Sequence, residues 1–260
     1  MFHSVRGSGP PIVLLHGIPT SGRLWHYVVD DLEHRYTCIA VDLPGFGETT
    51  LPPEGSLCLD DVAQQVEGLR EELGFPSWHV VGHDAGSALA VHYAVAYPRR
   101  VERMALVAPP VFPEFRRIWP FHLLQVKGLG EMLAPLVVFI MWSGVLQRGI
   151  DSSRPAMREI FDAFRRPFRG VAGSRRLLRI LRWGDPEEIL GRTAALLPGV
   201  EAPCLVIHGR HDEVVPSSFG ERAVEVLPDA RLVWLDHGHY LPLSLPEEVA
   251  AHVGPFLAAA

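Results

Sequence analysis

The chain has 260 residues, of which 48% are hydrophobic, and its formal net charge at pH 7 is −6. This length and apolar share predict one sizeable α/β domain with a large core. The negative charge argues against nucleic acid as a partner, because a polyanion would be repelled. Cys38, Cys58 and Cys204 cannot all pair, so we expect three reduced, buried side chains. Met1–Gly9 lacks the pattern of a signal peptide, which predicts a cytoplasmic protein.

The N-terminal part of the chain predicts two strands with a helix between them. Pro11–His16 is an apolar run typical of a buried parallel strand. Ser21–His34 carries apolar residues at helical spacing, and Ser21 is placed to cap the helix. Tyr36–Val41 predicts the second strand. The pattern is therefore that of a β-α-β unit.

The stretch Val80–Ala90 is the most informative part of the sequence. An apolar, β-branched run ends in Gly82-His83-Asp84-Ala85-Gly86 and passes directly into small residues at helical spacing. This pattern predicts a strand, a sharp turn that carries Asp84, and a helix. Gly82 and Gly86 suit positions where a side chain would collide with the neighbouring strand and helix.

This glycine-flanked turn resembles the nucleophile elbow of the α/β-hydrolase superfamily, with aspartate in place of the usual serine. The branch that it resembles holds the epoxide hydrolases and haloalkane dehalogenases. A carboxylate is already ionised and can displace a leaving group from a saturated carbon, whereas a serine hydroxyl suits acyl carbons. The resemblance implies that Asp84 is a nucleophile that forms an alkyl ester. The alternatives are an acidic residue at a loop tip and a disabled hydrolase.

Two other loops resemble motifs of the same superfamily. His16-Gly17-Ile18-Pro19 resembles the oxyanion loop, which implies that the backbone N–H groups of Ile18 and Ala85 point at the developing oxyanion and that the bond before Pro19 is cis. Asp42–Thr49 resembles a glycine-punctuated loop in which the aspartate fixes a turn. Relatives usually have a further strand before the first parallel one. Only about ten residues precede it here, so we expect that strand to be short or missing.

The alternation of strand and helix stops in the middle of the chain. Leu59–Leu73 predicts an amphipathic helix and Val101–Val107 a strand, but residues 110–197 contain no clear strand pattern. Relatives insert a helical cap at this point. The predicted domains are therefore an α/β-hydrolase core, residues 1–109 and 198–260, and a helical cap, residues 110–197, which we call the cap segment.

Two patterns in the cap segment have a structural and a functional interpretation. The apolar stretch Met132–Trp142 is too short to cross a bilayer and is interrupted by Pro135, so we interpret it as cap core or as a wall of the substrate cavity. No membrane partner is expected. Four arginines recur at helical spacing, which favours a solvated cap surface over a site for an anionic ligand. They are Arg175, Arg176, Arg179 and Arg182.

The C-terminal part resembles the superfamily's acid loop. Pro203–His208 predicts a strand, and Gly209–Pro216 matches G-x-x-D-x-x-V-P, which makes Asp212 the acid candidate. Glu114 is the second candidate, because some dehalogenases carry their acid after the preceding strand. His208 and His211 lack a third ligand at metal-like spacing, so we interpret them as structural and expect no metal.

The last predicted strand, Arg231–Leu235, leads to the candidate histidine. The step Gly238-His239-Tyr240 resembles the catalytic-histidine loop, which selects His239 over His237. Pro246–Leu257 predicts a closing helix.

Asp84, Asp212 and His239 each follow a predicted strand. In an open parallel sheet such loops converge at the carboxyl edge. The expected fold is the α/β-hydrolase fold, a mostly parallel twisted sheet with flanking helices and an inserted helical cap. The resemblance implies that Asp212 orients His239, which activates the water that hydrolyses the ester.

The leaving-group donors decide the reaction subclass. Haloalkane dehalogenases hold halide with a tryptophan directly after the nucleophile and a second donor, but this chain has Ala85 there and Ile18 where an asparagine is frequent. In the cap segment, three tryptophans are candidates to supply one of the missing halide donors, namely Trp119, Trp142 and Trp183. The cap tyrosine pair of epoxide hydrolases is also missing, because no tyrosine occurs between residues 97 and 240.

Three candidate donors for a departing alkoxide remain, namely Tyr240, Trp183 and His122. Because ring strain already activates an epoxide, the sequence favours epoxide hydrolysis of a small apolar organic substrate by water, without a cofactor. Haloalkane dehalogenation is the alternative reaction. A non-catalytic ligand-binding member of the fold is the third possibility.

Overall fold

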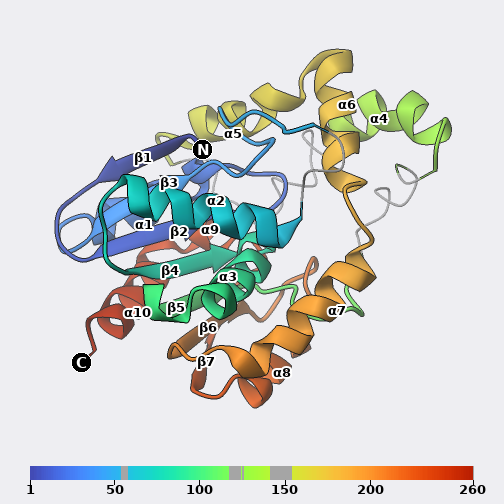
Figure 1. Cartoon of the computed structure of the whole chain (residues 1–260). Coiled ribbons are helices and arrows are strands. Elements are labelled where there is room, and N and C mark those ends of the chain that lie inside the picture. Colours follow the sequence, from blue (N-terminus) through green and yellow to red (C-terminus); the bar gives the residue numbers. More distant parts are fainter. Residues whose placement is uncertain (54–57, 117–123, 125, 141–153, 260) are drawn as a thin grey trace.

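The computed structural model of the chain describes residues 1–53, 58–116, 124, 126–140 and 154–259. One seven-stranded sheet runs through it in the order β1-β3-β2-β4-β5-β6-β7 (Figure 1). The strands are β1 (His3–Arg6), β2 (Pro11–Leu15), β3 (Thr37–Val41), β4 (Trp78–His83), β5 (Val101–Val107), β6 (Cys204–Gly209) and β7 (Ala230–Leu235). All neighbours pair in parallel except β1 and β3. The expected fold class is confirmed.

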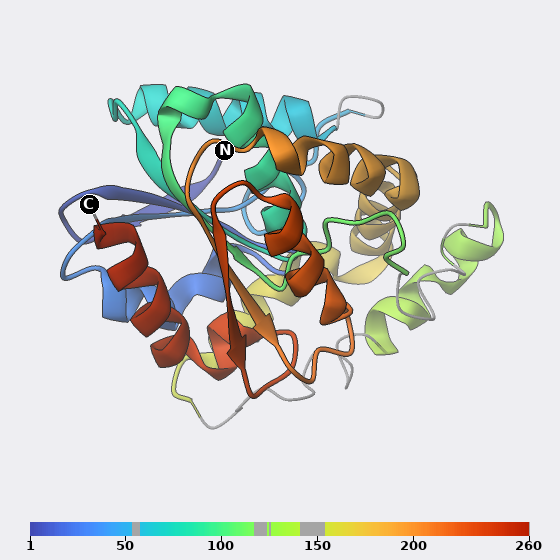
Figure 2. The same ribbon diagram turned by 90° about the horizontal axis from the view of Figure 1, so that it is seen from below.

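Helices cover both faces of the sheet. The α-helices of the described residues are α1 (His26–Leu32), α2 (Leu59–Glu72), α3 (Ala85–Ala96), α4 (Leu129–Ile140), α5 (Met157–Arg165), α6 (Gly170–Leu181), α7 (Pro186–Leu196), α8 (Ser218–Val226), α9 (Leu241–Ser244) and α10 (Pro246–Ala258). Figure 2 shows α2 and α3 on one face and α1 and α10 on the other. Strands covered on both faces are mainly apolar, and β4 is buried along its whole length.

The N-terminal strand that we expected to be short or missing is present and short. β1 has four residues and pairs antiparallel with β3, from His3 opposite Val41 to Arg6 opposite Cys38. The helix predicted from Ser21 begins as a 3-10 turn before α1. The hydroxyl of Ser21 accepts a hydrogen bond from the N–H of Arg23 at 3.3 Å, as expected for a cap.

The parallel register places four loop starts at one edge of the sheet. Leu15 of β2 pairs with Gly82 of β4, so the loops after these strands begin side by side. Gly209 of β6 pairs with Leu235 of β7 in the same way. The loops that carry Ile18, Asp84, Asp212 and His239 therefore leave the same carboxyl edge.

Between β5 and β6, the described residues of the cap segment form helices and turns without a strand. Figure 1 shows α4, α5 and α6 grouped at one end of the molecule. None of the helices in the described part of the chain is long and apolar enough to cross a membrane.

Two interpretations of the cap segment need correction, the first of them only in part. The stretch Met132–Trp142 was expected to be cap core or cavity wall. Ala134, Val137 and Val138 are buried as expected, but Met132 is 69% exposed and Leu136 is also exposed. Residues 141 and 142 lie outside the described residues. The arginines of α6 were expected to form a solvated surface. Instead, Arg176 donates to the carbonyls of Gly45 and Thr49 at 2.7 and 2.6 Å. Hydrogen bonds from a charged guanidinium are stronger than those between neutral groups, so these two contacts hold α6 against the loop after β3.

Cys58 also differs from expectation. Cys38 and Cys204 are buried, and all three thiols are free, but Cys58 is exposed at the start of α2. Its sulfur accepts a hydrogen bond from the N–H of Asp61 at 3.4 Å, so it occupies a helix-capping position rather than a core position.

Candidate active site

The turn between β4 and α3 has the geometry of a tight elbow. Asp84 lies at its apex with φ 49° and ψ −125°, a strained conformation for a residue with a side chain. A Cβ atom on Gly82 would lie 2.4 Å from the carbonyl oxygen of Gly86. A Cβ atom on Gly86 would lie 2.3 Å from the carbonyl oxygen of Leu15. Both glycines are therefore required for the close approach of β4, α3 and β2.

The oxyanion loop contacts the carboxylate of Asp84 directly. The N–H of Ile18 donates to Oδ2 of Asp84 at 3.0 Å, and the N–H of Ala85 also hydrogen-bonds this carboxylate. The peptide bond between Ile18 and Pro19 is cis, as expected. A Cβ atom on Gly17 would lie 2.4 Å from Cβ of Asp84, so only glycine allows this approach.

The other two residues of the expected triad lie beside Asp84. Nδ1 of His239 donates to Oδ2 of Asp212 at 2.8 Å. Nε2 of His239 faces Oδ1 of Asp84 at 3.8 Å. Oδ1 of Asp212 accepts from the N–H groups of Val214 and Val215, both at 2.8 Å. The bond from Nδ1 fixes the tautomer and leaves Nε2 of neutral His239 able to accept a proton.

Glu114, the second acid candidate, lies elsewhere. Its carboxylate pairs with Arg222 at 3.2 Å, and both side chains are exposed. Asp212 is therefore the acid that the structure brings to His239.

Burial and the neighbouring groups have opposite effects on the pKa of each of the three residues. It raises the pKa of Asp84, although the charge of His239 and the N–H groups of Ala85 and Ile18 oppose the shift. For Asp212 the effect of burial is outweighed by hydrogen bonds from His208 and His239, which hold the pKa of its carboxyl well below the ordinary range. For His239, burial favours the neutral form, but the hydrogen bond and charge of Asp212 and the charge of Asp84 raise its pKa.

Two buried histidines support this arrangement. Nε2 of His83 donates to the carbonyl of His239 at 3.0 Å, and burial lowers the pKa of His83 to about 3, so it stays neutral. Nε2 of His208 lies 3.5 Å from Oδ2 of Asp212 and donates to the carbonyl of Val215 at 3.2 Å. The role of His83 was not expected from the sequence. Its place directly before Asp84 was the available signal.

The remaining histidines and Asp42 have structural contacts. His211 pairs with Asp236 at 2.9 Å on the surface rather than with His208. His16 accepts a hydrogen bond at Nε2 from the N–H of Leu43 at 3.0 Å. Oδ1 of Asp42 accepts from the N–H of Gly22 at 2.8 Å, consistent with a turn-fixing residue.

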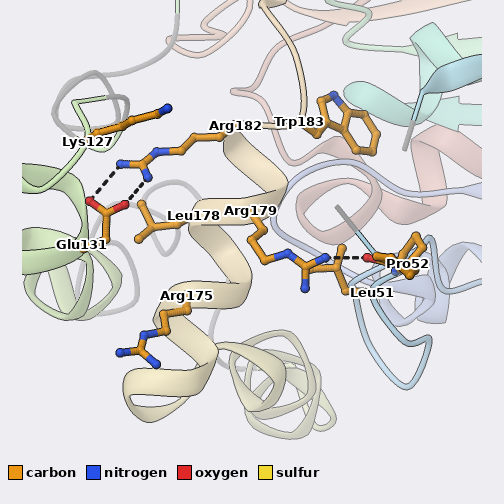
Figure 3. Close-up of a pocket in the computed structure, with 10 residues that line it drawn as sticks. Leu51, Pro52, Lys127, Glu131, Arg175, Leu178, Arg179, Arg182 and Trp183 are labelled. Atoms are coloured by element: carbon orange, nitrogen blue, oxygen red, sulfur yellow. Dashed lines mark hydrogen bonds and ion pairs between the residues drawn. The ribbon is translucent and has the colours of Figure 1, made fainter. Parts of the chain in front are cut away.

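The candidate leaving-group donors do not lie together at one site. Tyr240 is buried, and its ring centroid lies 5.0 Å from that of His239. Trp183 lines a cavity of about 620 Å³ between α6 and Leu51–Pro53, and none of the triad is among the described residues that line it (Figure 3). His122, Trp119 and Trp142 lie outside the described residues.

Comparison with known proteins identifies the family. Residues 10–137 match the family model described as alpha/beta hydrolase fold, and residues 128–251 match a serine hydrolase model that does not reach Asp84. A putative ancestral haloalkane dehalogenase superposes with a TM-score of 0.82 at 26% identity, covering 99% of this chain and 94% of the other. A haloalkane dehalogenase from Bradyrhizobium elkani gives 0.82 and 26%, covering 98% and 93%. The chain is an α/β hydrolase. It belongs to the branch with an aspartate nucleophile.

Two relatives of this hydrolase found by sequence carry the names of an esterase and a lipase. A pimeloyl-[acyl-carrier protein] methyl ester esterase of Nitrosomonas europaea is 29% identical over 93% of each chain. A human (lyso)-N-acylphosphatidylethanolamine lipase is 35% identical over 53% of the hydrolase and 44% of its own length. Sequence and structural similarity therefore point to different substrates within one superfamily.

Proposed function

We propose that the hydrolase displaces halide from small apolar haloalkanes through an alkyl ester on Asp84. Oδ1 of Asp84 attacks a saturated carbon, and the carbon–halogen bond breaks with its electron pair leaving on the halide. His239 then takes a proton from water, whose oxygen attacks Cγ of Asp84. The tetrahedral intermediate collapses, Oδ1 leaves as the oxygen of the alcohol with the proton that His239 returns, and the restored carboxyl group releases the second proton of the water to solvent. The incoming oxygen stays on the carboxylate.

The observation that carries this proposal is the hydrogen bond from Ile18 to Oδ2 of Asp84. In the ester, Oδ2 is the carbonyl oxygen, and it becomes the oxyanion when water attacks. The N–H of Ile18 already donates to that atom, and the N–H of Ala85 hydrogen-bonds the same carboxylate. They would stabilise the hydrolysis of an ester formed on Asp84 itself, because donors placed before the reaction need no reorganisation.

The same contact argues against direct attack on a carboxylic ester substrate. Such a reaction needs the two N–H groups for the carbonyl oxygen of the substrate. Here Oδ2 of Asp84 occupies the N–H of Ile18 at 3.0 Å. The names of the esterase and lipase relatives therefore carry less weight than the aspartate at the elbow.

Haloalkanes take precedence over epoxides because of the structural neighbours. Haloalkane dehalogenases superpose over 98 to 99% of this chain at 26% identity. The sequence favoured epoxides because Ala85 and Ile18 replace the familiar halide donors. Epoxide hydrolysis remains the second candidate, supported by the buried Tyr240, whose ring lies beside His239.

The test compares three substrate classes under one set of conditions. Purified hydrolase is incubated with terminal bromoalkanes, with styrene oxide and with a short methyl ester, and halide, diol and acid are measured. We expect halide release that is absent in Asp84→Asn. Diol formation without halide release would favour the second candidate, and acid formation alone that survives in Asp84→Asn would contradict both.

A single turnover in heavy-oxygen water tests the covalent step. With enzyme in excess, the alcohol should carry ordinary oxygen from Asp84, and the label should appear in the peptide that contains Asp84. Label in the alcohol after the first turnover would mean that water attacks the substrate directly.

A further inference from the structure

The helix α4 is apolar on both of its faces, although only one face is covered. One face packs towards α6 and is formed by Gly130, Ala134, Val137 and Val138. The opposite face is exposed and is formed by Leu129, Met132, Leu136, Phe139 and Ile140. Phe139 is 68% exposed. Water-facing helices normally carry polar side chains on the outer face, so this apolar face is suited to a second apolar environment.

The position of α4 leaves its exposed face accessible. Figures 1 and 2 both show α4 at the outer edge of the molecule, away from the sheet. Val171, on the neighbouring α6, is 62% exposed and lines a hollow of about 500 Å³ together with Phe139. Val126, just before α4, is exposed as well. The apolar surface therefore extends beyond one helix.

Basic side chains lie next to this apolar surface. The cap segment holds 14 of the chain's 24 Lys and Arg residues but only 8 of its 30 Asp and Glu residues, so it is basic in a protein with a net charge of −6. Arg165 and Arg169 line the hollow beside Phe139 and share Asp162 as an ion-pair partner, at 3.3 and 2.9 Å.

A second basic group lies near the start of α4. Lys127 and Arg175 are exposed and line the cavity drawn in Figure 3, where Arg179 extends towards Pro52 and Arg175 extends away from it. Glu131, the one acidic residue of α4, is bound to Arg182. Cationic side chains therefore lie near both ends of α4.

We propose that the exposed face of α4 docks the hydrolase on the surface of an anionic phospholipid bilayer. The apolar side chains enter the acyl boundary, and the flanking cations bind lipid phosphates. The charge pattern favours a bilayer over an uncharged apolar partner. Peripheral docking needs no spanning helix, so it is compatible with a chain in which no described helix is long enough to cross a membrane. The sequence predicted no membrane partner because the apolar stretch Met132–Trp142 is too short to cross a bilayer. The length of a stretch does not determine whether its side chains are exposed.

The test is flotation of the full-length hydrolase with vesicles. Equimolar phosphatidylcholine and phosphatidylglycerol should bind the protein at least about tenfold more tightly than phosphatidylcholine alone. Phe139→Glu should weaken this binding by at least about tenfold. The matched control is Phe2→Glu. Phe2 is 53% exposed but lies before β1, outside the cap segment, so this variant should bind like the wild type.

A second pair of variants tests the electrostatic part. Arg175→Glu should weaken binding to the anionic vesicles by at least about tenfold, whereas Arg35→Glu, at another exposed arginine, should have little effect. Thermal unfolding midpoints and turnover of a dissolved substrate should be unchanged in all four variants, which separates docking from folding and from the proposed reaction.

Three outcomes would overturn the proposal. The first is failure of the wild type to bind either vesicle, and the second is equal binding by Phe139→Glu and Phe2→Glu. The third is a wild-type dimer in sedimentation velocity that Phe139→Glu alone converts to a monomer without vesicle binding by the wild type. That result would mean that a second copy of the chain covers α4.

Discussion

Nε2 of His239 faces Oδ1 of Asp84 at 3.8 Å, too far for a hydrogen bond. A nucleophile that needed His239 to remove its own proton would have to lie within hydrogen-bonding distance of it. A carboxylate has no such proton to lose, so Asp84 and His239 can act in different steps. In the proposed reaction, Asp84 acts in alkylation and His239 acts in hydrolysis of the ester.

Asp84→Asn should abolish turnover and leave the fold intact. The amide has nearly the same volume but is neutral and a poor nucleophile, so we expect a loss of at least about a thousandfold in kcat/KM. Activity is measured on freshly purified protein, with circular dichroism as the control for folding. Full activity without deamidation to aspartate would contradict a nucleophilic role for Asp84.

His239→Gln should stop the cycle after the ester has formed. Alkylation needs only the carboxylate of Asp84, whereas hydrolysis needs a base for water. Intact-protein mass spectrometry should show a substrate adduct that maps to the peptide containing Asp84. The matched control is His237→Gln in the same loop, which should turn over without an adduct. An unmodified, inactive His239→Gln protein would mean that His239 is needed for the first step.

Acidic solution should trap the same ester in the wild type. In the ester, Asp84 no longer carries a charge, but the hydrogen bond and charge of Asp212 still raise the pKa of His239 against the effect of burial. His239 should therefore gain its proton as the pH falls. Ester hydrolysis should then slow by about tenfold for each further pH unit. The charge of protonated His239 beside Asp84 favours the ionised carboxylate, so alkylation should continue. Rapid quenching at successive pH values should show ester accumulation on the acidic side, and a constant ester level across this range would contradict the assignment.

Much of the core of the fold was predictable because its signals are local. The strands follow from apolar runs, and the elbow follows from the glycines on either side of Asp84. The loops of Asp84, Asp212 and His239 follow from the rule that parallel strands share a carboxyl edge. The oxyanion role of the Ile18 N–H was implied by resemblance alone, and its hydrogen bond to Asp84 is seen only in the structure. The contact of His83 with the His239 carbonyl joins residues far apart in sequence, so no periodicity could predict it.

The cap segment was less predictable for a physical reason. Helical periodicity identifies which residues share a face of α4, but it does not determine what covers that face. Met132 and Phe139 are apolar in sequence and exposed in the structure. The arginines of α6 show the converse, because Arg176 binds backbone carbonyls in a loop that is distant in sequence. Both outcomes depend on tertiary packing.

Gly17→Ala should impair the reaction without a general loss of folding. The new Cβ would lie 2.4 Å from Cβ of Asp84, so the oxyanion loop or the carboxylate must move. Loss of one aligned N–H donor costs about a hundredfold or more in kcat. Gly68→Ala is the matched control, because no atom lies within 4 Å of its added Cβ. Equal activity of the two variants would show that the Ile18 contact is dispensable.

The leaving-group donor should separate the two candidate reactions. Tyr240→Phe removes one hydroxyl from a buried ring beside His239, so substrate binding should survive. If a departing alkoxide needs that hydroxyl, opening of an epoxide should slow by about ten- to a thousandfold in a single turnover. Release of halide should be nearly unaffected, because halide needs no proton.

Trp183→Phe is the complementary variant, since it removes an indole N–H that can hold halide. For a dehalogenase, we expect Trp183→Phe to slow alkylation by a haloalkane by at least about tenfold and Tyr240→Phe to leave it unchanged. Burst kinetics with a bromoalkane and with styrene oxide measure both variants against the wild type. If neither variant changes either burst rate, the donor is another residue of the cap segment, and the assignment of Tyr240 and Trp183 is wrong.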